Sequence, residues 1–340
     1  MAIEWQVLGQ AGADNALFIT VDSGQSRESL LFDCGEGCLH DLRPSAIQSV
    51  AHLFLSHFHM DHVSGFDTFF RHNYNRPDGP VQVWGPPGTI DLMWHRFNGF
   101  IWNLHADQPG EWVVREISNR QIKTGRFFAG EAFATIHHQM EQVLDSTVVF
   151  RTFGWHLETK LLPHGTIPSL ACRIVESSKK NIDPATMHSL GLIPGPWLKA
   201  LTEGEVQDST AIQLGDQSFT FGELRKQLLL TTPGDSLAYL TDFRIEPGTQ
   251  EWRDLVVWLT GTTTLVCECQ YRSADTNLAV QNGHMTAGLV GRLAAEAGVG
   301  KLVLQHLSRR YRRDEWLAMR DEAKAAFPRT ELPPEWLSLG

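Results

Sequence analysis

Short apolar runs alternate along this chain with longer amphipathic segments. Apolar runs of four to eight residues bounded by polar or turn residues are typical of buried strands, and segments with a helical period are typical of helices. The pattern predicts helices at about 63–74, 88–103, 286–298, where Thr286 is a plausible N-cap, and 314–326. It predicts strands at 6–8, 17–20, 29–32, 81–84, 159–162, 237–240, 264–267 and 301–304.

The pattern loosens between residues 176 and 235, where four prolines interrupt it: Pro184, Pro194, Pro196 and Pro233. The apolar runs on either side belong to one alternating series. We therefore expect a single domain over residues 1–340, with an arm-like excursion inserted at about 176–235.

A polar residue that can hold a metal ion or move a proton closes six of the apolar runs. These residues are Asp33, His57, His164, Asp242, Glu268 and His306. In α/β proteins the carboxyl ends of the strands gather at one edge of a sheet, and functional side chains collect there. The six residues are therefore candidates for one site.

The densest cluster of such side chains is the segment 55–62, Leu-Ser-His-Phe-His-Met-Asp-His, which follows the apolar run 53–55. A strand that ends there places His57 and His59 on the same side of the chain, whereas Asp61 and His62 follow in the turn and point to a second position. Imidazole and carboxylate ligands without a thiolate suit a catalytic ion, most often Zn²⁺, with Mn²⁺ or Fe²⁺ as alternatives.

A site for two ions needs more ligands than this loop supplies. His164, Asp242 and His306 each follow an apolar run in the same way, and a carboxylate between two cations can bridge them. We expect His57, His59 and His164 at the first ion, Asp61, His62 and His306 at the second, and Asp242 shared. The other histidines lack this context and are expected to be structural, including His72, His95, His105, His137, His138, His156 and His188.

Composition narrows the class of protein. The five cysteines form no disulfide framework, and Cys267 and Cys269 alternate within a predicted strand, so both are expected to be buried. The N-terminus carries no secretory signal, and the chain has no apolar run long enough to span a bilayer. We therefore expect a cytoplasmic protein without a membrane partner. The formal net charge of −10 argues against non-specific coating of nucleic acid, although four arginines cluster between 309 and 313.

The metal-ligand pattern and its flanks resemble the metallo-β-lactamase superfamily, and within it ribonuclease Z, the tRNA 3′-processing endonuclease family. Three further segments carry the resemblance: the acidic glycine turn at 31–37, the glycine-proline segment at 191–199, and the block 304–311 around His306. The resemblance covers about residues 5–312. It implies the four-layer αβ/βα metallo-β-lactamase fold, in which two β-sheets lie between helices.

The resemblance also implies a function. It implies a hydrolase with two divalent metal ions, in which a water attacks a phosphodiester and Asp61 orients that water. Glu268 and His284 occupy the places of the acid and the histidine that the family uses around the leaving group. Glu268 would hold His284 protonated, and His284 would give the proton. Arg310 and Lys199 are candidate substrate contacts, the implied substrate is precursor tRNA, and a homodimer is implied.

Several positions depart from the family pattern. The segment 9–15 lacks the usual Pro-Thr and Arg-Asn element, the usual Gly-Asp-Thr is Thr241-Asp242-Phe243, and Lys199 is the lone cation between Gly191 and Glu223. Two alternatives therefore stay open: a hydrolase of a smaller phosphodiester, an ester or a lactone, and a metal-binding protein without catalysis. A steep loss of affinity with added salt would favour the RNA substrate.

Overall fold

The computed structural model describes residues 2–22, 27–152, 154–203 and 206–337. The chain divides into two compact units, one made of residues 1–175 with 236–340 and the other of residues 176–235. The arm-like excursion expected from the sequence corresponds to the second unit.

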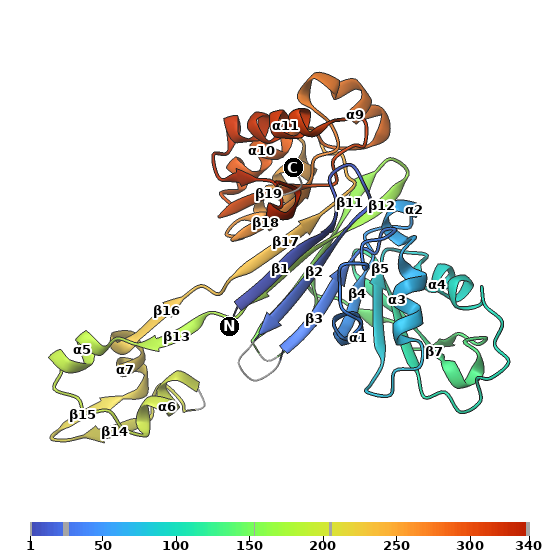
Figure 1. The fold of residues 1–340 in the computed structure, drawn as a ribbon. Helices are drawn as coiled ribbons and strands as arrows, with labels where there is room; N and C mark the ends of the chain where they lie inside the picture. The colour runs from blue at the N-terminus through green and yellow to red at the C-terminus, as the bar shows by residue number, and fades with distance from the viewer. Residues whose placement is uncertain (1, 23–26, 153, 204–205, 338–340) are drawn as a thin grey trace. The chain divides into compact units, whose positions relative to one another are not determined.

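The first sheet of the larger unit runs in the order β1-β2-β3-β4-β5-β6-β7-β8, and β9 pairs with β7 (Figure 1). Strands β3 to β6 are parallel, and their flanking neighbours are antiparallel. The strands are β1 (Ala2–Gly9), β2 (Asn15–Asp22), β3 (Arg27–Phe32), β4 (Val50–Phe54), β5 (Val81–Gly85), β6 (Glu111–Ile117), β7 (Gln121–Phe128), β8 (His137–His138) and β9 (Gln142–Val143).

The second sheet of this unit runs in the order β10-β11-β12-β17-β18-β19-β20. Strands β17 to β20 are parallel, and β12 is antiparallel to β17. The strands are β10 (Val148–Arg151), β11 (Trp155–His164), β12 (Ile167–Glu176), β17 (Ser236–Leu240), β18 (Thr264–Glu268), β19 (Lys301–Gln305) and β20 (Thr330–Glu331).

Helices cover the outer faces of the two sheets (Figure 1). Those after β3 to β5 are α1 (Pro44–Ser49), α2 (Met60–Val63), α3 (Phe66–Asn73) and α4 (Thr89–Phe97), and those of the C-terminal part are α8 (Gln250–Leu259), α9 (Thr276–Asn282), α10 (Ala287–Ala297), α11 (Arg313–Ala326) and α12 (Pro334–Leu337). Two 3₁₀ turns lie at Ala129–Glu131 and Ser273–Asp275.

Alternation along the strands produces this layering. Leu31, Leu53 and Val83 pack with the helices on the outer face of the first sheet. Phe32 and Phe54 point the other way and join the apolar residues of the second sheet. Because successive side chains of a strand face opposite sides, one short apolar run contributes side chains both to the core between the two sheets and to the core under the helices. The four-layer αβ/βα metallo-β-lactamase fold is therefore confirmed.

The predicted strands are all present, but two of the predicted helices differ from the observed ones: one is divided in two, and the other ends earlier than predicted. The helix predicted at 63–74 is interrupted at Gly65, whose N–H donates to the carbonyl of Cys34 at 2.8 Å. A Cβ atom at Gly65 would lie 2.2 Å from the carbonyl oxygen of Gly35, so the chain needs glycine at this close approach. The helix predicted at 88–103 ends at Phe97, where the side chain of Asn98 donates to the carbonyl of Trp94.

The predicted helices near the C-terminus agree with the structure. Helix α10 begins after Thr286, which occupies the N-cap position without a side-chain capping bond, and it ends at Gly298 in the left-handed conformation. Helix α11 begins one residue before the predicted start, at Arg313.

The smaller unit has its own apolar core. Two antiparallel strand pairs, β13 (Lys179–Ile182) with β16 (Leu229–Thr232) and β14 (Ala211–Leu214) with β15 (Gln217–Thr220), accompany helices α5 (Pro184–Ser189), α6 (Trp197–Glu203) and α7 (Phe221–Leu228). Leu201, Leu224 and Leu228 are fully buried at its centre. Two of its helices have strong N-caps, Asp183 at α5 and a Thr220–Glu223 capping box at α7.

Two expectations from composition can be compared with the structure. Cys34, Cys38, Cys172, Cys267 and Cys269 are all free thiols and all buried, which confirms that Cys267 and Cys269 are buried; Cys267 lies in β18, and Cys269 follows the end of that strand by one residue. Within the described part of the chain, every helix is too short or too polar to cross a lipid bilayer.

His52 on β4 is a buried histidine outside the metal cluster. Its ring is 4% exposed, lies 4.6 Å from the ring of Phe150 between centroids, and accepts at Nδ1 a hydrogen bond from the indole N–H of Trp84. Burial, together with the charges of Arg115 and Arg76, lowers the pKa of His52 to about 3. The folded protein therefore keeps His52 neutral in weak acid.

We expect His52 to make the protein less stable as the pH falls. Below about pH 6.5 the unfolded chain binds a proton at this histidine that the folded chain does not bind until about pH 3, so stability decreases through that window. The loss should reach about 2 kcal/mol at pH 5. In urea unfolding, His52→Gln should remove this part of the pH dependence between pH 7 and 5. Parallel pH curves for the two proteins would contradict the assignment.

Candidate active site

The segment that carries His57, His59, Asp61 and His62 begins after the carboxyl end of β4 and continues into helix α2. His57 and His62 are 1% exposed, whereas the side chain of Asp61 is 44% exposed. His59 precedes α2 in an extended conformation and Asp61 lies in the first turn of α2, so the change from extended to helical backbone presents these side chains in two directions. The loop thus begins two adjacent groups, as the sequence predicts.

The other predicted residues arrive at the same place from the second sheet. His164 is the last residue of β11, Asp242 follows β17 by two residues, and His306 follows β19 directly. Strand β11 runs in the same direction as β17. Only Gly165 and Thr166 separate β11 from its neighbour β12, so these two strands are antiparallel, and β12 is antiparallel to β17. The carboxyl ends of these strands therefore meet at one edge.

Asp242 lies at the centre of the cluster, and its two oxygens face different groups. Oδ2 is 3.7 Å from Nε2 of His57 and 3.7 Å from Nε2 of His164. Oδ1 is 3.3 Å from Nε2 of His62 and 3.4 Å from Nδ1 of His306. Ligand atoms around a tetrahedral zinc ion are separated by about 3.3 Å, the edge expected for bonds of 2.0–2.1 Å. The spacing matches two sites that share one carboxylate.

Three sets of side chains offer ligand atoms within 4.8 Å of one another. One is His57, His59, His164 and Asp242, a second is Asp61, His62 and His306, and a third is Asp242, His284 and His306. The structure therefore brings together the seven residues assigned from the sequence. It also brings His284 to the edge of the cluster, with Nε2 3.9 Å from Oδ2 of Asp242.

The hydrogen bonds of the histidines leave ring nitrogens free for an ion. Nδ1–H of His62 donates to Asp33 at 2.8 Å, and Nδ1–H of His164 donates to the carbonyl of Gly283 at 3.0 Å. Ser56 donates its hydroxyl to Asp33 and accepts from Nδ1–H of His57 at 3.0 Å. Such partners fix the tautomer that keeps a lone pair on Nε2.

Nε2 of His57 and Nε2 of His62 are buried and have no hydrogen-bond partner among the described residues. A buried polar nitrogen without a partner is costly unless something else satisfies it. The donor set, its spacing and these two nitrogens all fit bound divalent metal.

The charges of the cluster interact strongly. Burial lowers the pKa of His57 to about 2, with the neighbouring His62 acting in the same direction. Burial also opposes a charge on His62, but the carboxylates of Asp242 and Asp33 raise its pKa well above the usual value, so a metal ion bound at Nε2 would replace a proton there. For Asp242 burial favours the neutral acid, yet His306 and His62 hold its pKa well below the usual range. The site therefore holds its carboxylates charged, as cation binding requires.

Glu268 and His284 form a separate pair beside Asp242. Glu268 is fully buried, accepts the backbone N–H of Phe243 at 2.7 Å with Oε1, and lies 3.1 Å from Nδ1 of His284 with Oε2. Burial disfavours the imidazolium, but the charge and hydrogen bond of Glu268 raise the pKa of His284 to about 9. His284 is therefore protonated near neutral pH, and Nε2 carries a proton that faces the cluster.

Backbone strain is concentrated at this site. Asp33, Asp242 and His306 have φ values of +58°, +47° and +52° without being glycines. Such conformations cost energy, and they persist where the surrounding structure fixes them. Each directly follows or nearly follows a strand of a parallel ladder, so the turn out of the sheet orients the side chain.

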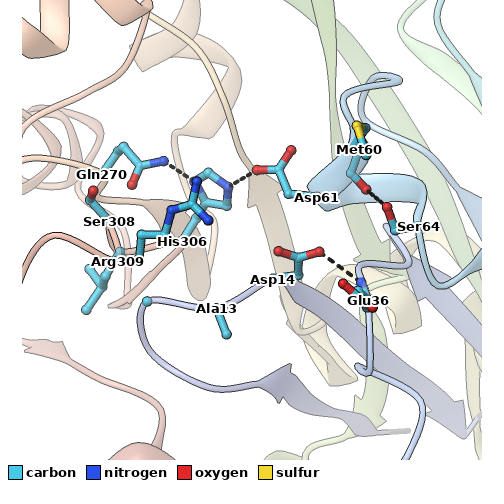
Figure 2. Close-up of a pocket in the computed structure, with 12 residues that line it drawn as sticks. Ala13, Asp14, Glu36, Met60, Asp61, Ser64, Gln270, His306, Ser308 and Arg309 are labelled. Carbon is cyan, nitrogen blue, oxygen red and sulfur yellow. Dashed lines mark hydrogen bonds and ion pairs between the residues drawn. The ribbon is translucent and has the colours of Figure 1, made fainter.

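An open cavity of about 790 Å³ adjoins the cluster and reaches Asp61 and His306 (Figure 2). It is lined by Gly12, Ala13, Asp14, Glu36, Met60, Asp61, Ser64, Gln270, His306, Leu307, Ser308 and Arg309. Arg309 lines it, whereas Arg310 stacks over the ring of Tyr271 at 5.5 Å. Lys199 belongs to the smaller unit, where it is exposed and pairs with Glu203.

This chain is similar to proteins of known sequence and structure. The chain is 39% identical over 332 residues to "Ribonuclease Z" of Deinococcus radiodurans, covering 97% of this chain and 98% of the relative. The chain belongs to the ribonuclease Z family. A ribonuclease Z of Synechococcus sp. (strain CC9605) is 29% identical, covering 96% and 92%. The family model for the anti-Pycsar protein Apyc1 matches residues 11–161.

Solved structures agree on the fold. The short form of human tRNase Z has a TM-score of 0.55 at 18% identity, covering 91% of this chain and 94% of that one. The metallo-β-lactamase fold protein YhfI of Bacillus subtilis has a TM-score of 0.55 at 16% identity, covering 98% and 96%. With its cluster of histidines and aspartates, this member of the ribonuclease Z family is a metal-dependent hydrolase that binds divalent metal.

Several residues that hydrogen-bond to the cluster were not predicted from the sequence. Tyr239 donates its hydroxyl to Asp33 at 2.9 Å, Thr241 donates to Oδ1 of Asp242 at 2.7 Å, and the side-chain amide of Gln270 hydrogen-bonds Nδ1 of His306 at 3.2 Å. Ser56 and Thr241 each precede a ligand directly, which is a usable signal. Tyr239 lies inside an apolar run, so the sequence predicts a core residue there.

We expect Asp33→Asn to weaken metal binding roughly 10- to 100-fold, because an amide N–H₂ would oppose the Nδ1–H donor of His62 and favour the wrong tautomer. Competition with a chromophoric chelator would measure the affinity. Asp41→Asn, the same change at an exposed position, is the control. Equal affinities for Asp33→Asn and the unaltered protein, both folded by circular dichroism, would contradict the role.

Proposed function

We propose that this chain is a two-metal endoribonuclease that removes the 3′ trailer from precursor tRNA. The observation that carries the proposal is the position of Asp242, whose two oxygens face two separate groups of histidines. The names of its ribonuclease Z relatives supply the substrate class. We infer zinc as the metal, because imidazole and carboxylate without thiolate suit it, with manganese or iron as alternatives.

We propose that His57, His59 and His164 hold one ion, that Asp61, His62 and His306 hold the other, and that Asp242 bridges them. Two divalent cations supply a lowered pKa for a bound water and neutralise charge on phosphoryl oxygens. The side chains of the protein itself would orient the attacking water and protonate the leaving oxygen.

Asp61 is the ligand best exposed to the cavity, and its Oδ2 also lies 3.4 Å from Nε2 of His306. Burial opposes its charge, yet the hydrogen bond with His306 and the charges of His62 and His306 keep the pKa of Asp61 below its usual range. It therefore remains an acceptor, and we infer that it orients the attacking water toward phosphorus by accepting a hydrogen bond.

His284 is the proposed proton donor to the leaving oxygen. It stands on the side of Asp242 that faces His57 and His164, and Glu268 holds its Nδ1 so that Nε2 carries the mobile proton. A ribose oxygen is a poor leaving group without protonation. Donation from Nε2 would supply that proton as the bond to phosphorus breaks.

The proposal is tested by parallel turnover assays on a precursor tRNA with a 3′ trailer and on bis(p-nitrophenyl) phosphate, each with zinc or manganese. We expect cleavage of the tRNA after its mature 3′ end, lost in His59→Ala. Cleavage of the small diester alone would reject the tRNA substrate and leave the two-metal chemistry. Inactivity on both would reject phosphodiester hydrolysis.

Arg310 and Lys199 stay predictions as substrate contacts, and the homodimer implied by the resemblance stays a prediction that analytical ultracentrifugation would test. Lowered salt should strengthen binding of the tRNA steeply if the substrate contacts extend along its backbone.

A further inference from the structure

The cavity beside the metal cluster has acidic side chains on one side and cationic or amide side chains on the other. Asp14 and Glu36 lie on one side, and Arg309 with Gln270 lies on the other (Figure 2). A substrate that reaches Asp61 and His306 passes between them. An anionic phosphate is attracted to the arginine side and repelled by the carboxylate side. The two sides therefore favour different parts of a nucleotide.

Asp14 is held firmly in the wall of this cavity. Its Oδ2 accepts the backbone N–H of Glu36 at 2.9 Å, and its carbonyl oxygen accepts from the thiol of Cys38 at 3.3 Å. A Cβ atom at Gly35 would lie 2.5 Å from Cβ of Asp14, so the turn at Gly35 packs directly against this side chain. The carboxylate has a fixed position before any substrate binds.

The loop that carries Asp14 is also tied to the metal cluster. The neighbouring Asn15 accepts the backbone N–H of His306 at 3.2 Å and donates to the carbonyl of Gln10 at 3.1 Å. A Cβ atom at Gly12 would lie 3.2 Å from Cα of Arg309, so the two walls of the cavity are in close contact at their base. Asp14 is thus positioned relative to the site of reaction, which is the condition for selective recognition.

The second carboxylate oxygen of Asp14, Oδ1, can still accept a hydrogen bond. Among the interactions of the described residues, its side chain takes part in the bond to Glu36 and in no ion pair. Oδ1 therefore remains open to a donor from the cavity. A nucleoside offers such donors on its ribose hydroxyls and its exocyclic amino groups, and a carboxylate accepts from either.

From this arrangement we propose that Asp14 is a specificity-determining residue, whose carboxylate accepts a hydrogen bond from a neutral donor of the nucleoside next to the scissile phosphate. Arg309, across the cavity, faces the phosphate. The inference rests on the proposed function, because it assumes a nucleic-acid substrate in this cavity. It predicts that a negative charge at position 14 assists cleavage of a negatively charged substrate.

The test compares Asp14→Asn with the unaltered protein on precursor tRNA and on bis(p-nitrophenyl) phosphate, whose aryl groups carry no hydrogen-bond donor. Asparagine keeps the size of the side chain and an oxygen for Glu36, but it turns the free end into a donor. We expect the ratio of kcat/KM for tRNA to that for the small diester to fall roughly 10- to 100-fold, the range for a hydrogen bond to a charged group. Asp41→Asn makes the same change at an exposed position that does not line the cavity and should leave the ratio unchanged.

Modified substrates identify the donor. A precursor with a single 2′-deoxy nucleotide on either side of the cleavage site removes a ribose donor, and base changes there remove amino donors. One of these substrates should be cut slowly by the unaltered protein and should not be slowed further by Asp14→Asn, since both changes delete the same bond.

Three outcomes decide the matter. If Asp14→Asn cuts tRNA as fast as the unaltered protein or faster, the carboxylate is neutral or repels the substrate, and the inference is overturned. An equal loss in Asp41→Asn would overturn it too, because the effect would then be one of general charge. If the unaltered protein leaves precursor tRNA uncut, the proposed function itself fails, which is a separate result.

Discussion

Asp242→Asn should lower hydrolysis of a phosphodiester by roughly 10³-fold or more, which corresponds to several kcal/mol of lost stabilisation of the transition state. The reason is geometric, because each oxygen of Asp242 faces a different group of histidines. An amide offers one neutral oxygen in place of two charged ones. The variant should therefore lose metal as well as activity.

The measurement is kcat together with metal content by inductively coupled plasma mass spectrometry. The unaltered protein should carry about two ions per chain and the variant fewer, in keeping with a bridging ligand. Asp254→Asn, the same change at an exposed position of α8, should alter neither quantity. Full activity with unchanged metal content in Asp242→Asn would show that Asp242 does not bridge two metal ions.

His284→Ala should slow cleavage of RNA by roughly 10²- to 10⁴-fold, the usual contribution of a positioned proton donor. It should slow bis(p-nitrophenyl) phosphate far less, because p-nitrophenolate leaves as a stable anion and needs no proton. Metal content should stay at the level of the unaltered protein. These three results together separate a proton donor from a ligand.

The control for this variant is His188→Ala, which removes an exposed imidazole from the smaller unit. A loss of metal in His284→Ala, with both substrates slowed equally, would instead assign His284 to the third ligand set, with Asp242 and His306. Glu268→Gln should resemble His284→Ala in its preference between substrates, because it removes the charge that keeps the imidazole protonated.

The seven side chains that meet in the cluster could be singled out from the sequence because each lies at or just after the end of a short apolar run, and their role as metal ligands stays a prediction. Histidine and aspartate are rare directly after an apolar strand, and the segment 55–62 contains four of them. The period of the strands and the rule that parallel strands end at one edge then suffice to group distant residues such as His164 and His306. The resemblance to a known family supplied Glu268 and His284.

The helix ends were harder to predict, because contacts between distant segments decide them. Gly65 divides α2 from α3 where its backbone meets Gly35. Asn98 ends α4 where its side-chain amide donates to the distant carbonyl of Phe133 at 3.1 Å, as well as to that of Trp94. Neither contact is visible in the local pattern, since the apolar period continues through both positions.

The sequence by itself determined the alternation of strands and helices, the set of histidines and aspartates proposed to hold metal, and the family, because these depend on residue type and spacing. The tertiary structure alone decided which nitrogen of each histidine is free, through partners such as Asp33 and Gly283, and which oxygen of Asp242 faces which group. It also decided that Asp14 and Arg309 face one cavity. These are relations between side chains far apart in sequence, and they are fixed by packing and hydrogen bonding between the two sheets.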